Sequence, residues 1–469
     1  MGTHACRMAG AVMPMMIERI VSEGLSHNSY LIGDGSAAAV IDPRRDIGIY
    51  CEIAEKNGLT ITHIFETHRN EDYCVGSIDL SRRTGAWIFH GAHLPFAYGN
   101  PAYDGDEFAI GSLRIGVKET PGHTDESISL VVIDSAVSSE PLCVFTGDAL
   151  FAGDVGRTDF FKDRLEEMAG KLYDSIVTKI LPLGDGVIVY PAHGAGSVCG
   201  GDISDHPFTT VGYERKTNPL LQNGRDEFVG RKIAEHHYIP PYFRMMEHYN
   251  QNGAPSLSER RCMDALSPEQ VNGVISAGAL AIDLRGPAGF AGGHIPGSLN
   301  IWKNGLSAFL GYFAAYDRPI LFIDDFNENL PSAEVQALRL GYDSVAGYLH
   351  GGIGSWYRAG GAVGRCGTCS VTDVDPGDPE QFILDVRDIN NRRSMGAIPG
   401  SHHVYTGHIE MHLAEIPADR PVLVYCDAGF KGSLAASVLL RHGYSDVTNL
   451  LGGMAAWKQA GLPVEDGAA

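Results

Sequence analysis

An internal repeat in the second half of the chain constrains the fold more than any other feature of the sequence. The blocks at 279–301, 318–328 and 348–360 recur in the same order at 381–404, 420–430 and 449–461. Matching Pro, Arg and Trp residues within these blocks lie 103, 102 and 101 residues apart. A nearly constant spacing over three blocks indicates two copies of one structural unit. Each copy alternates short apolar strands with helical segments, so we expect two α/β domains with central parallel sheets.

The residues before 250 have a different texture, in which short apolar strands end in polar loops. The stretches LTITHIFET (59–67), PLCVFTGD (141–148) and GVIVYPAHG (186–194) each run from an apolar strand into a loop that bears His or Asp. Reactive groups at strand ends are typical of an active site built on a sheet.

These changes of texture predict the domain limits. Gly-rich or polar stretches at 250–261 and 360–373 read as the two linkers. The Met-rich start reads as a ragged leader and not as a signal peptide. We therefore predict a leader, a strand-rich domain and the two copies at 1–16, 17–250, 251–363 and 370–466.

Composition limits the partners. The 469 residues, 44% of them apolar, suffice for two to four domains, and the formal net charge is −21 with no Lys/Arg-rich run. We therefore expect no nucleic-acid or membrane partner. No apolar run is long enough to span a bilayer. Nine scattered cysteines are not a secreted disulfide framework, so we expect a cytoplasmic protein.

The stretch ETHRNEDY (66–73) is a partial copy of the metal-binding pattern T-H-x-H-x-D-H, which serves two zinc ions. His68 and Asp72 hold their expected positions, whereas Asn70 and Tyr73 stand where the other histidines belong. The stretch therefore predicts either a lost metal site or a site for a different metal.

Two further loops supply ligands that complete a set with His68. His123 lies on the Pro-Gly turn of TPGHTDES, and Asp148 follows an apolar strand and a glycine. Two imidazoles and one carboxylate suit a mononuclear Fe(II) centre with three open positions, whereas zinc hydrolases use more histidines. Asp72 and His193 remain as ligands of a second metal or, as we prefer, as groups that orient the first ligands, with Tyr73 beside them.

The strings PGHTDES, FTGDALFAGDVGRTDF, YPAHGAG and YERKTNP resemble the metallo-β-lactamase fold, and within it the persulfide dioxygenases. The resemblance covers residues 17–225. It implies an αββα sandwich and one iron held by His68, His123 and Asp148. It also implies that Arg157 helps to bind the anionic thiol carrier of the substrate; a surface arginine in a turn is the alternative.

The stretch LVYCDAGFKGSLAASVLL (423–440) predicts a strand, a tight loop and a helix, with Cys426 at the start of the loop. Backbone N–H groups, the helix N-terminus and Lys431 would lower the pKa of the thiol and hold an anion. The second copy resembles a rhodanese, which implies that Cys426 is the nucleophile that carries sulfane sulfur. The first copy has Asp324 at the matching position, so it resembles a rhodanese without activity.

The roles of three other cysteines stay undecided. Cys199 follows His193 closely and is either a sulfur-handling thiol or an inert loop residue. Cys366 and Cys369 form a single C-x-x-C, too few ligands for a structural zinc site, with a reversible disulfide as the alternative.

The combined resemblance implies a persulfide dioxygenase fused to a sulfurtransferase that functions in sulfide detoxification. It would oxidise glutathione persulfide or an equivalent with O₂ to sulfite and thiol, and Cys426 would interconvert persulfide and thiosulfate. Its partners would be these small molecules, and we expect a homo-oligomer, a dimer or a tetramer. One alternative is a zinc-dependent thioester hydrolase similar to hydroxyacylglutathione hydrolases. Another is a sulfur carrier or scaffold in which only Cys426 works.

Overall fold

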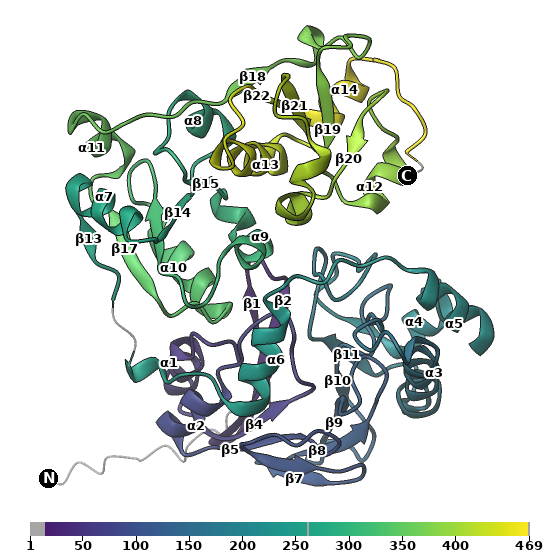
Figure 1. Ribbon diagram of the computed structural model, residues 1–469. Helices are drawn as coiled ribbons and strands as arrows, with labels where there is room; N and C mark the ends of the chain where they lie inside the picture. Colours follow the sequence, from purple (N-terminus) through teal and green to yellow (C-terminus); the bar gives the residue numbers. More distant parts are fainter. Residues whose placement is uncertain (1–14, 260–261, 468–469) are drawn as a thin grey trace, which may run out of the picture. The chain divides into compact units, whose positions relative to one another are not determined.

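The structure is a computed structural model that describes residues 15–259 and 262–467 (Figure 1). The predicted leader at 1–16 lies outside the described residues apart from its last two positions. The chain divides into two compact units. The first ends at Glu259 and also takes Arg339–Gly341, and the second holds the remaining described residues.

Two six-stranded sheets build the first unit. One has the order β1-β2-β3-β4-β5-β6, with β1 (Met16–Ser22), β2 (His27–Asp34), β3 (Ala37–Ile41), β4 (Thr60–Glu66), β5 (Trp87–Gly91) and β6 (Asn100–Ala102). The other has the order β12-β11-β10-β9-β8-β7, with β7 (Glu107–Ile110), β8 (Leu113–Glu119), β9 (Ile128–Asp134), β10 (Cys143–Gly147), β11 (Ile188–Pro191) and β12 (Thr209–Thr210). The helices are α1 (Gly48–Lys56), α2 (Ser77–Thr84), α3 (Leu165–Ser175), α4 (Val211–Thr217), α5 (Arg225–Ala234) and α6 (Phe243–Asn252).

Three apolar cores show how these elements are layered. Phe65 of the first sheet and Leu130 of the second share one core, so the two sheets pack face to face. Tyr50 of α1 joins a core with the other face of the first sheet. Leu172 of α3 and Phe228 of α5 join a core with the other face of the second sheet. The unit is therefore an αββα sandwich, which confirms the predicted fold class.

Two five-stranded parallel sheets build the second unit, and both have the same strand order. The first is β13-β17-β16-β14-β15, with β13 (Ala265–Leu266), β14 (Leu280–Asp283), β15 (Leu299–Asn300), β16 (Ile320–Ile323) and β17 (Val345–Leu349). The second is β18-β22-β21-β19-β20, with β18 (Gly367–Cys369), β19 (Phe382–Asp385), β20 (His402–His403), β21 (Val422–Tyr425) and β22 (Val447–Leu450). The predicted repeat is thus a repeat of topology.

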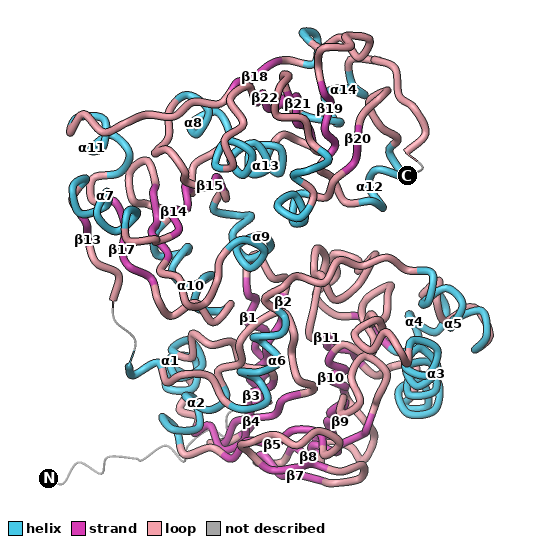
Figure 2. Tube along the Cα trace, viewed as in Figure 1, coloured by secondary structure: helices cyan, strands magenta, loops and turns pink. Residues whose placement is uncertain are grey.

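Helices lie beside both of these sheets (Figure 2). In the first copy they are α7 (Pro268–Ser276), α8 (Pro287–Gly292), α9 (Leu306–Phe313), α10 (Leu330–Arg339) and α11 (Gly352–Arg358). In the second copy they are α12 (Ile389–Met395), α13 (Phe430–Arg441) and α14 (Gly453–Gln459). None of the helices in the described part of the chain is long and apolar enough to cross a bilayer.

The repeat extends to buried ion pairs. Arg285 donates to both carboxylate oxygens of Asp283 at 2.9 and 2.7 Å, and Arg387 does the same to Asp385 at 2.9 and 2.6 Å. Planar two-point pairing of this kind fixes the direction of both side chains. Each pair therefore holds the loop after the second strand of its copy in the same conformation.

Two elements cross the domain limits that composition predicts. Helix α6 continues to Asn252, beyond the predicted end of the first domain at residue 250. Strand β18 starts at Gly367 and pairs with β22 of the second copy, although the second copy was predicted to start at residue 370. Composition marks a linker only approximately because a short edge strand can be as Gly- and Thr-rich as a loop.

Candidate metal centre and cysteine loop

Four loops at the ends of strands bring together the predicted metal-site residues of the first unit. His68 follows β4, His123 follows β8, Asp148 follows β10 and His193 follows β11. Gly147 has a φ of 54°, and a Cβ there would lie 2.6 Å from the hydroxyl oxygen of Thr67. The glycine therefore permits the close approach of the β10 loop to the β4 loop.

His68, His123 and Asp148 lie together as the sequence predicts. Asp148 Oδ2 is 3.7 Å from His68 Nε2 and 3.5 Å from His123 Nε2, and the two imidazole centres are 4.9 Å apart. Two atoms that each bind one ion at about 2.1 Å, roughly at right angles or tetrahedrally, lie about 3.0–3.5 Å apart. The three donor atoms therefore have nearly the spacing of ligands on one ion.

Hydrogen bonds leave the correct nitrogen of each histidine free. His68 Nδ1 lies 2.9 Å from Thr67 Oγ1, whose own proton goes to Asp42 Oδ2 at 2.8 Å. The hydroxyl oxygen must therefore accept a hydrogen bond from the Nδ1–H of His68. His123 Nδ1 donates in the same way to the carbonyl of Arg157 at 2.9 Å. In the neutral form of each ring, Nε2 consequently carries a lone pair toward the centre, as in metal-binding histidines.

The atoms that face the centre have no hydrogen-bond partner. His68 Nε2, His123 Nε2 and Asp148 Oδ2 are all buried and unpartnered. Such atoms are rare in proteins because burying a polar group without a partner costs free energy. Three of them converging on one point fit a metal ion, and this mixture of imidazole and carboxylate donors suits Fe(II) or Zn(II).

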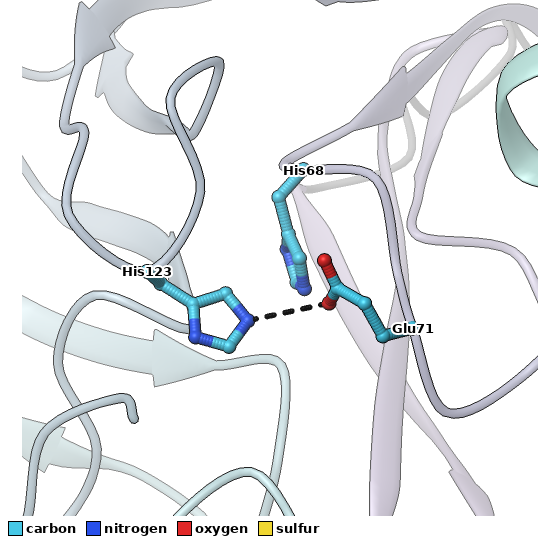
Figure 3. Close-up of side chains that lie close together, drawn as sticks. All are labelled: His68, Glu71 and His123. Atoms are coloured by element: carbon cyan, nitrogen blue, oxygen red, sulfur yellow. Dashed lines mark ion pairs between the residues drawn. The ribbon is translucent and has the colours of Figure 1, made fainter. Parts of the chain in front are cut away.

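Glu71 also faces the centre, and the sequence analysis missed it. Its Oε2 lies 3.6 Å from His123 Nε2, and donor atoms of His68, Glu71 and His123 all lie within 4.8 Å of one another. Figure 3 shows the three side chains pointing toward one another. In the metal-binding pattern this position is unspecified, so the only available sign was an acid directly before Asp72.

Burial and charge set the protonation of these groups. Burial lowers the pKa of His68 to about 4. Burial alone would also lower the pKa of His123, but the carboxylates of Glu71 and Asp148 outweigh it and raise the pKa. Burial opposes ionisation of Asp148, but the imidazoles of His193, His68 and His123 outweigh it and lower its pKa. Asp148 is therefore ionised and His68 neutral at pH 7, the forms that bind metal.

His193 connects Asp148 with Asp72. Its Nδ1 lies 2.7 Å from Asp148 Oδ1 and its Nε2 lies 3.0 Å from Asp72 Oδ2. Tyr73 is fully buried and stacks on His27, with ring centres 3.9 Å apart. Asp72 and His193 thus have the geometry of groups that orient the Asp148 carboxylate.

Cys199 is buried next to this pair. Donor atoms of Asp72, His193 and Cys199 lie within 4.8 Å of one another, which makes them a second group of candidate ligands. Burial raises the pKa of Cys199 far above its ordinary value. The thiol is therefore neutral at pH 7 in this environment.

Arg157 is not the surface arginine of the alternative prediction, and its part in substrate binding stays a prediction. Its side chain is fully buried, and it donates to both oxygens of Asp159 at 2.6 and 2.7 Å and to the carbonyls of Val198 and Tyr238 at 3.2 Å. A substrate carboxylate would have to replace these bonds. In this arrangement Arg157 instead fixes the loop whose carbonyl holds His123.

Cys426 lies directly after β21, in a loop that leads into α13. The N–H of Gly429, which has a φ of 94°, donates to its sulfur at 3.1 Å. Lys431 Nζ lies 2.5 Å from Asp427, so part of its charge is compensated within the loop. The predicted cradle of N–H groups around the sulfur is therefore present.

The predicted lowering of the Cys426 pKa is wrong as a net effect. Burial raises the pKa of the thiol, and this outweighs the N–H groups of Gly432, Ala428 and Gly429 and the charge of Lys431, all of which lower it. The cradle limits the rise in pKa, because a buried thiolate without these groups would be still less stable.

Hydrogen bonds between its own residues hold the matching loop of the first copy. Asp324 is buried after β16, and its carboxylate accepts from the backbone N–H and the side-chain amide of Asn329 at 3.0 and 2.9 Å. Its carbonyl accepts from Ile353 at 2.9 Å, as that of Cys426 accepts from Met454 at 2.8 Å. The two loops are thus equivalent in the fold, and the first has an acid in the place of the thiol.

The C-x-x-C residues do not form a disulfide. Cys366 and Cys369 are both free thiols, and Cys366 contacts the carbonyl of Val447 at 3.4 Å. Cys369 belongs to β18. That they can form a reversible disulfide remains a prediction.

Known protein families match both units. The family described as "Metallo-beta-lactamase superfamily" matches residues 23–193, and "Rhodanese-like domain" matches residues 267–359 and 373–460. A metallo-β-lactamase from Staphylococcus aureus is similar over 72% of this chain and 99% of its own, with 31% identity and a TM-score of 0.64.

Two curated relatives resemble the first unit. Persulfide dioxygenase ETHE1 of Homo sapiens is 28% identical over 47% of this chain and 81% of its own length. Hydroxyacylglutathione hydrolase GloC of Haemophilus influenzae is 27% identical over 45% of this chain and 99% of its own length. The chain therefore belongs to the metallo-β-lactamase superfamily and carries two rhodanese-like domains after its lactamase domain.

Proposed function

We propose that the first unit oxidises a low-molecular-weight persulfide with O₂ at one iron, and that the second unit transfers sulfane sulfur through Cys426. The first reaction balances as RSSH + O₂ + H₂O → RSH + H₂SO₃. Glutathione persulfide or an equivalent thiol persulfide is the substrate. The similarity to persulfide dioxygenase ETHE1 supports this choice of substrate.

The observation that carries the proposal is the set of unpartnered donor atoms. His68 Nε2, His123 Nε2 and Asp148 Oδ2 converge without hydrogen bonds, whereas their other polar atoms are all engaged. Two imidazoles and one carboxylate on one side of an ion form the ligand set of non-haem Fe(II) oxygenases. Iron in this site would supply adjacent open positions for the terminal sulfur and for O₂.

The surrounding residues fix this ligand set. Asp42 holds the Thr67 hydroxyl, and the hydroxyl holds the His68 ring. His193 holds Asp148. Such outer partners set ligand direction and basicity, and they typically change metal affinity 10–100-fold when removed. Burial of the ligands also keeps bulk water from competing with the substrate.

The second reaction uses the loop around Cys426. The thiolate attacks the outer sulfur of RSSH, the S–S bond breaks, RSH leaves, and Cys426 becomes a persulfide. Sulfite then takes that outer sulfur, which gives thiosulfate and regenerates the thiolate. The same steps in reverse form persulfide from thiosulfate. The N–H of Gly429 and the charge of Lys431 stabilise the anionic sulfur in both directions.

Elemental analysis combined with oxygen uptake tests the proposal. Protein purified without added metal should contain about one iron per chain. Added glutathione persulfide should cause O₂ uptake with sulfite formed in equal amount. His68→Ala should lose both the iron and the uptake. An iron-loaded protein that consumes no O₂ with persulfide would contradict the proposed oxidation.

A zinc-dependent thioester hydrolase is the second candidate function. The similarity to hydroxyacylglutathione hydrolase GloC and the second donor group of Asp72, His193 and Cys199 favour it. It predicts two zinc ions per chain and hydrolysis of S-lactoylglutathione. The absence of imidazoles at Asn70 and Tyr73 argues against it, because dinuclear zinc sites of this fold use them.

A further inference from the structure

We propose that Glu71 is a fourth protein ligand of the metal in the first unit, so that the centre has two histidines and two carboxylates. The inference rests on the metal site of the proposed function but not on the oxidation that we assign to it. It concerns a residue that the metal-binding pattern of this fold leaves unspecified.

Distance is the first argument. Glu71 Oε2 lies 3.6 Å from His123 Nε2, and Asp148 Oδ2 lies 3.5 Å from the same nitrogen. The new carboxylate is therefore as close to His123 as a ligand that the family already implies. Both distances are close to those between neighbouring ligands on one ion, about 3.0–3.5 Å, and a donor atom of His68 lies within 4.8 Å of both Glu71 and His123. Figure 3 shows the carboxylate beside the His68 ring, with one oxygen facing His123.

The surroundings of the Glu71 carboxylate are the second argument. The residue is 1% exposed, and neither carboxylate oxygen has a hydrogen-bond partner. Oε1 faces the guanidinium of Arg69 at 3.6 Å, and Oε2 faces His123. The group is thus a buried carboxylate with one oxygen directed at the centre.

Other buried glutamates of the same unit show that this state is unusual. Glu66 accepts from the Tyr98 hydroxyl at 3.0 Å, and Glu126 accepts from the Arg69 N–H at 2.8 Å. Within residues 15–259 and 262–467, Glu71 is the one buried glutamate with both oxygens unpartnered. Its ion pairs with Arg69 and His123 are both 3.6 Å long, so a metal ion at the centre would supply the direct contact that this buried carboxylate lacks.

A fourth ligand changes what the centre can accept. A six-coordinate ion held by four side chains keeps two open positions instead of three. Two positions suffice for one sulfur atom and one O₂ molecule. Two carboxylates also neutralise the charge of a divalent ion in a buried site, which lowers the free energy of placing the ion there.

Metal titration of isosteric variants tests this inference without any measurement of activity. Apo protein is titrated with Fe(II) under anaerobic conditions and, separately, with Co(II), whose visible absorption changes with coordination number. We expect Glu71→Gln to bind both ions at least tenfold more weakly and to shift the Co(II) spectrum. Glu71→Asp, which keeps a shorter carboxylate, should lose less affinity.

Glu126→Gln is the matched control, because it removes a buried carboxyl group of the same neighbourhood that already has a hydrogen bond. It should leave affinity and spectrum unchanged. Thermal unfolding of the apo proteins checks that each variant is folded. Unchanged affinity and spectrum in Glu71→Gln, with binding lost in Asp148→Asn, would overturn the role of Glu71 and leave the metal site standing. A wild-type protein that binds neither ion would overturn the metal site itself.

Discussion

Single hydrogen bonds decide which nitrogen of a histidine can bind metal. His68 is an example, because the Thr67 hydroxyl accepts a hydrogen bond from its Nδ1 only while the same hydroxyl donates one to Asp42. The two hydrogen bonds, from His68 Nδ1 to Thr67 and from Thr67 to Asp42, fix both the position of the proton and the orientation of the imidazole ring. Individual hydrogen bonds to the ligands therefore set the affinity for the metal.

Thr67→Val tests this chain of bonds. Valine has the shape of threonine but cannot accept from Nδ1, so we expect the affinity for Fe(II) or Co(II) to fall about 10–100-fold. Metal titration of the apo protein measures it. Thr62→Val is the matched control, because Thr62 makes the same contact at 2.9 Å to His63, which is not among the candidate ligands. Equal affinities in the two variants would show that the tautomer is fixed in another way.

Cys426 is the second residue at which protonation decides chemistry. Because burial raises the pKa of the thiol, its alkylation by iodoacetamide should still accelerate as the pH rises through 9. Lys431→Met removes a charge that lowers this pKa, so alkylation at any given pH should be slower. Mass spectrometry of the Cys426 peptide gives the rates. Lys458→Met, an exposed lysine of α14, should have no effect. A rate that levels off below pH 8 would contradict the raised pKa.

Contacts between elements link the two copies of the second unit. Asn300, at the end of β15, is buried and lies against α13, the helix that follows the Cys426 loop. Its backbone N–H donates to Ser437 Oγ at 3.0 Å, and Ser433 Oγ donates to its side-chain oxygen at 2.5 Å. Its amide nitrogen donates to the carbonyls of Asp283 and Arg285. The copy that has Asp324 in place of the cysteine thus supports the helix of the copy that has Cys426.

Asn300→Ala should loosen α13. The change removes three side-chain hydrogen bonds and leaves buried carbonyls unpaired, which costs about 1–3 kcal/mol for each group left unsatisfied. We expect faster hydrogen–deuterium exchange in peptides that cover Phe430–Arg441. Asn391→Ala, at an exposed position of α12 in the same unit, is the control. Unchanged exchange would mean that α13 is held by its own sheet alone.

Elements also show what could be predicted from the sequence. The internal repeat predicted the two α/β copies, because spacing along the chain is a local property, and the resemblance to a known fold predicted the sandwich. His68, His123 and Asp148 lie together as predicted, and that they bind a metal stays a prediction. Glu71 and the buried state of Arg157 could not be predicted, since both depend on which loops meet in space. The net pKa of Cys426 failed for the same reason, because the sequence shows the loop but not the depth of burial.

At the scale of the whole molecule, the two candidate sites lie in two different compact units. The candidate metal centre lies entirely in the unit that ends at Glu259, and Cys426 lies in the other. The hydrogen bonds described above for the metal centre and for the Cys426 loop join only residues of the same unit. In the proposed function, sulfite formed at the first site would be the acceptor at the second, so a shared small molecule would relate the two units.

This separation predicts that each activity can be removed alone. Chelation of the metal should abolish O₂ uptake with glutathione persulfide and leave transfer of sulfur from thiosulfate to a thiol or cyanide unchanged. Cys426→Ser should do the reverse, because serine has the same shape but cannot carry a persulfide. In the intact protein, persulfide and O₂ together should yield thiosulfate, whereas Cys426→Ser should yield only sulfite. Ion chromatography distinguishes the two anions.

If Cys426→Ser also lost O₂ uptake while its iron content stayed at the wild-type level, the two reactions would be one coupled reaction, and the thiol would have to act before the oxidation and not after it.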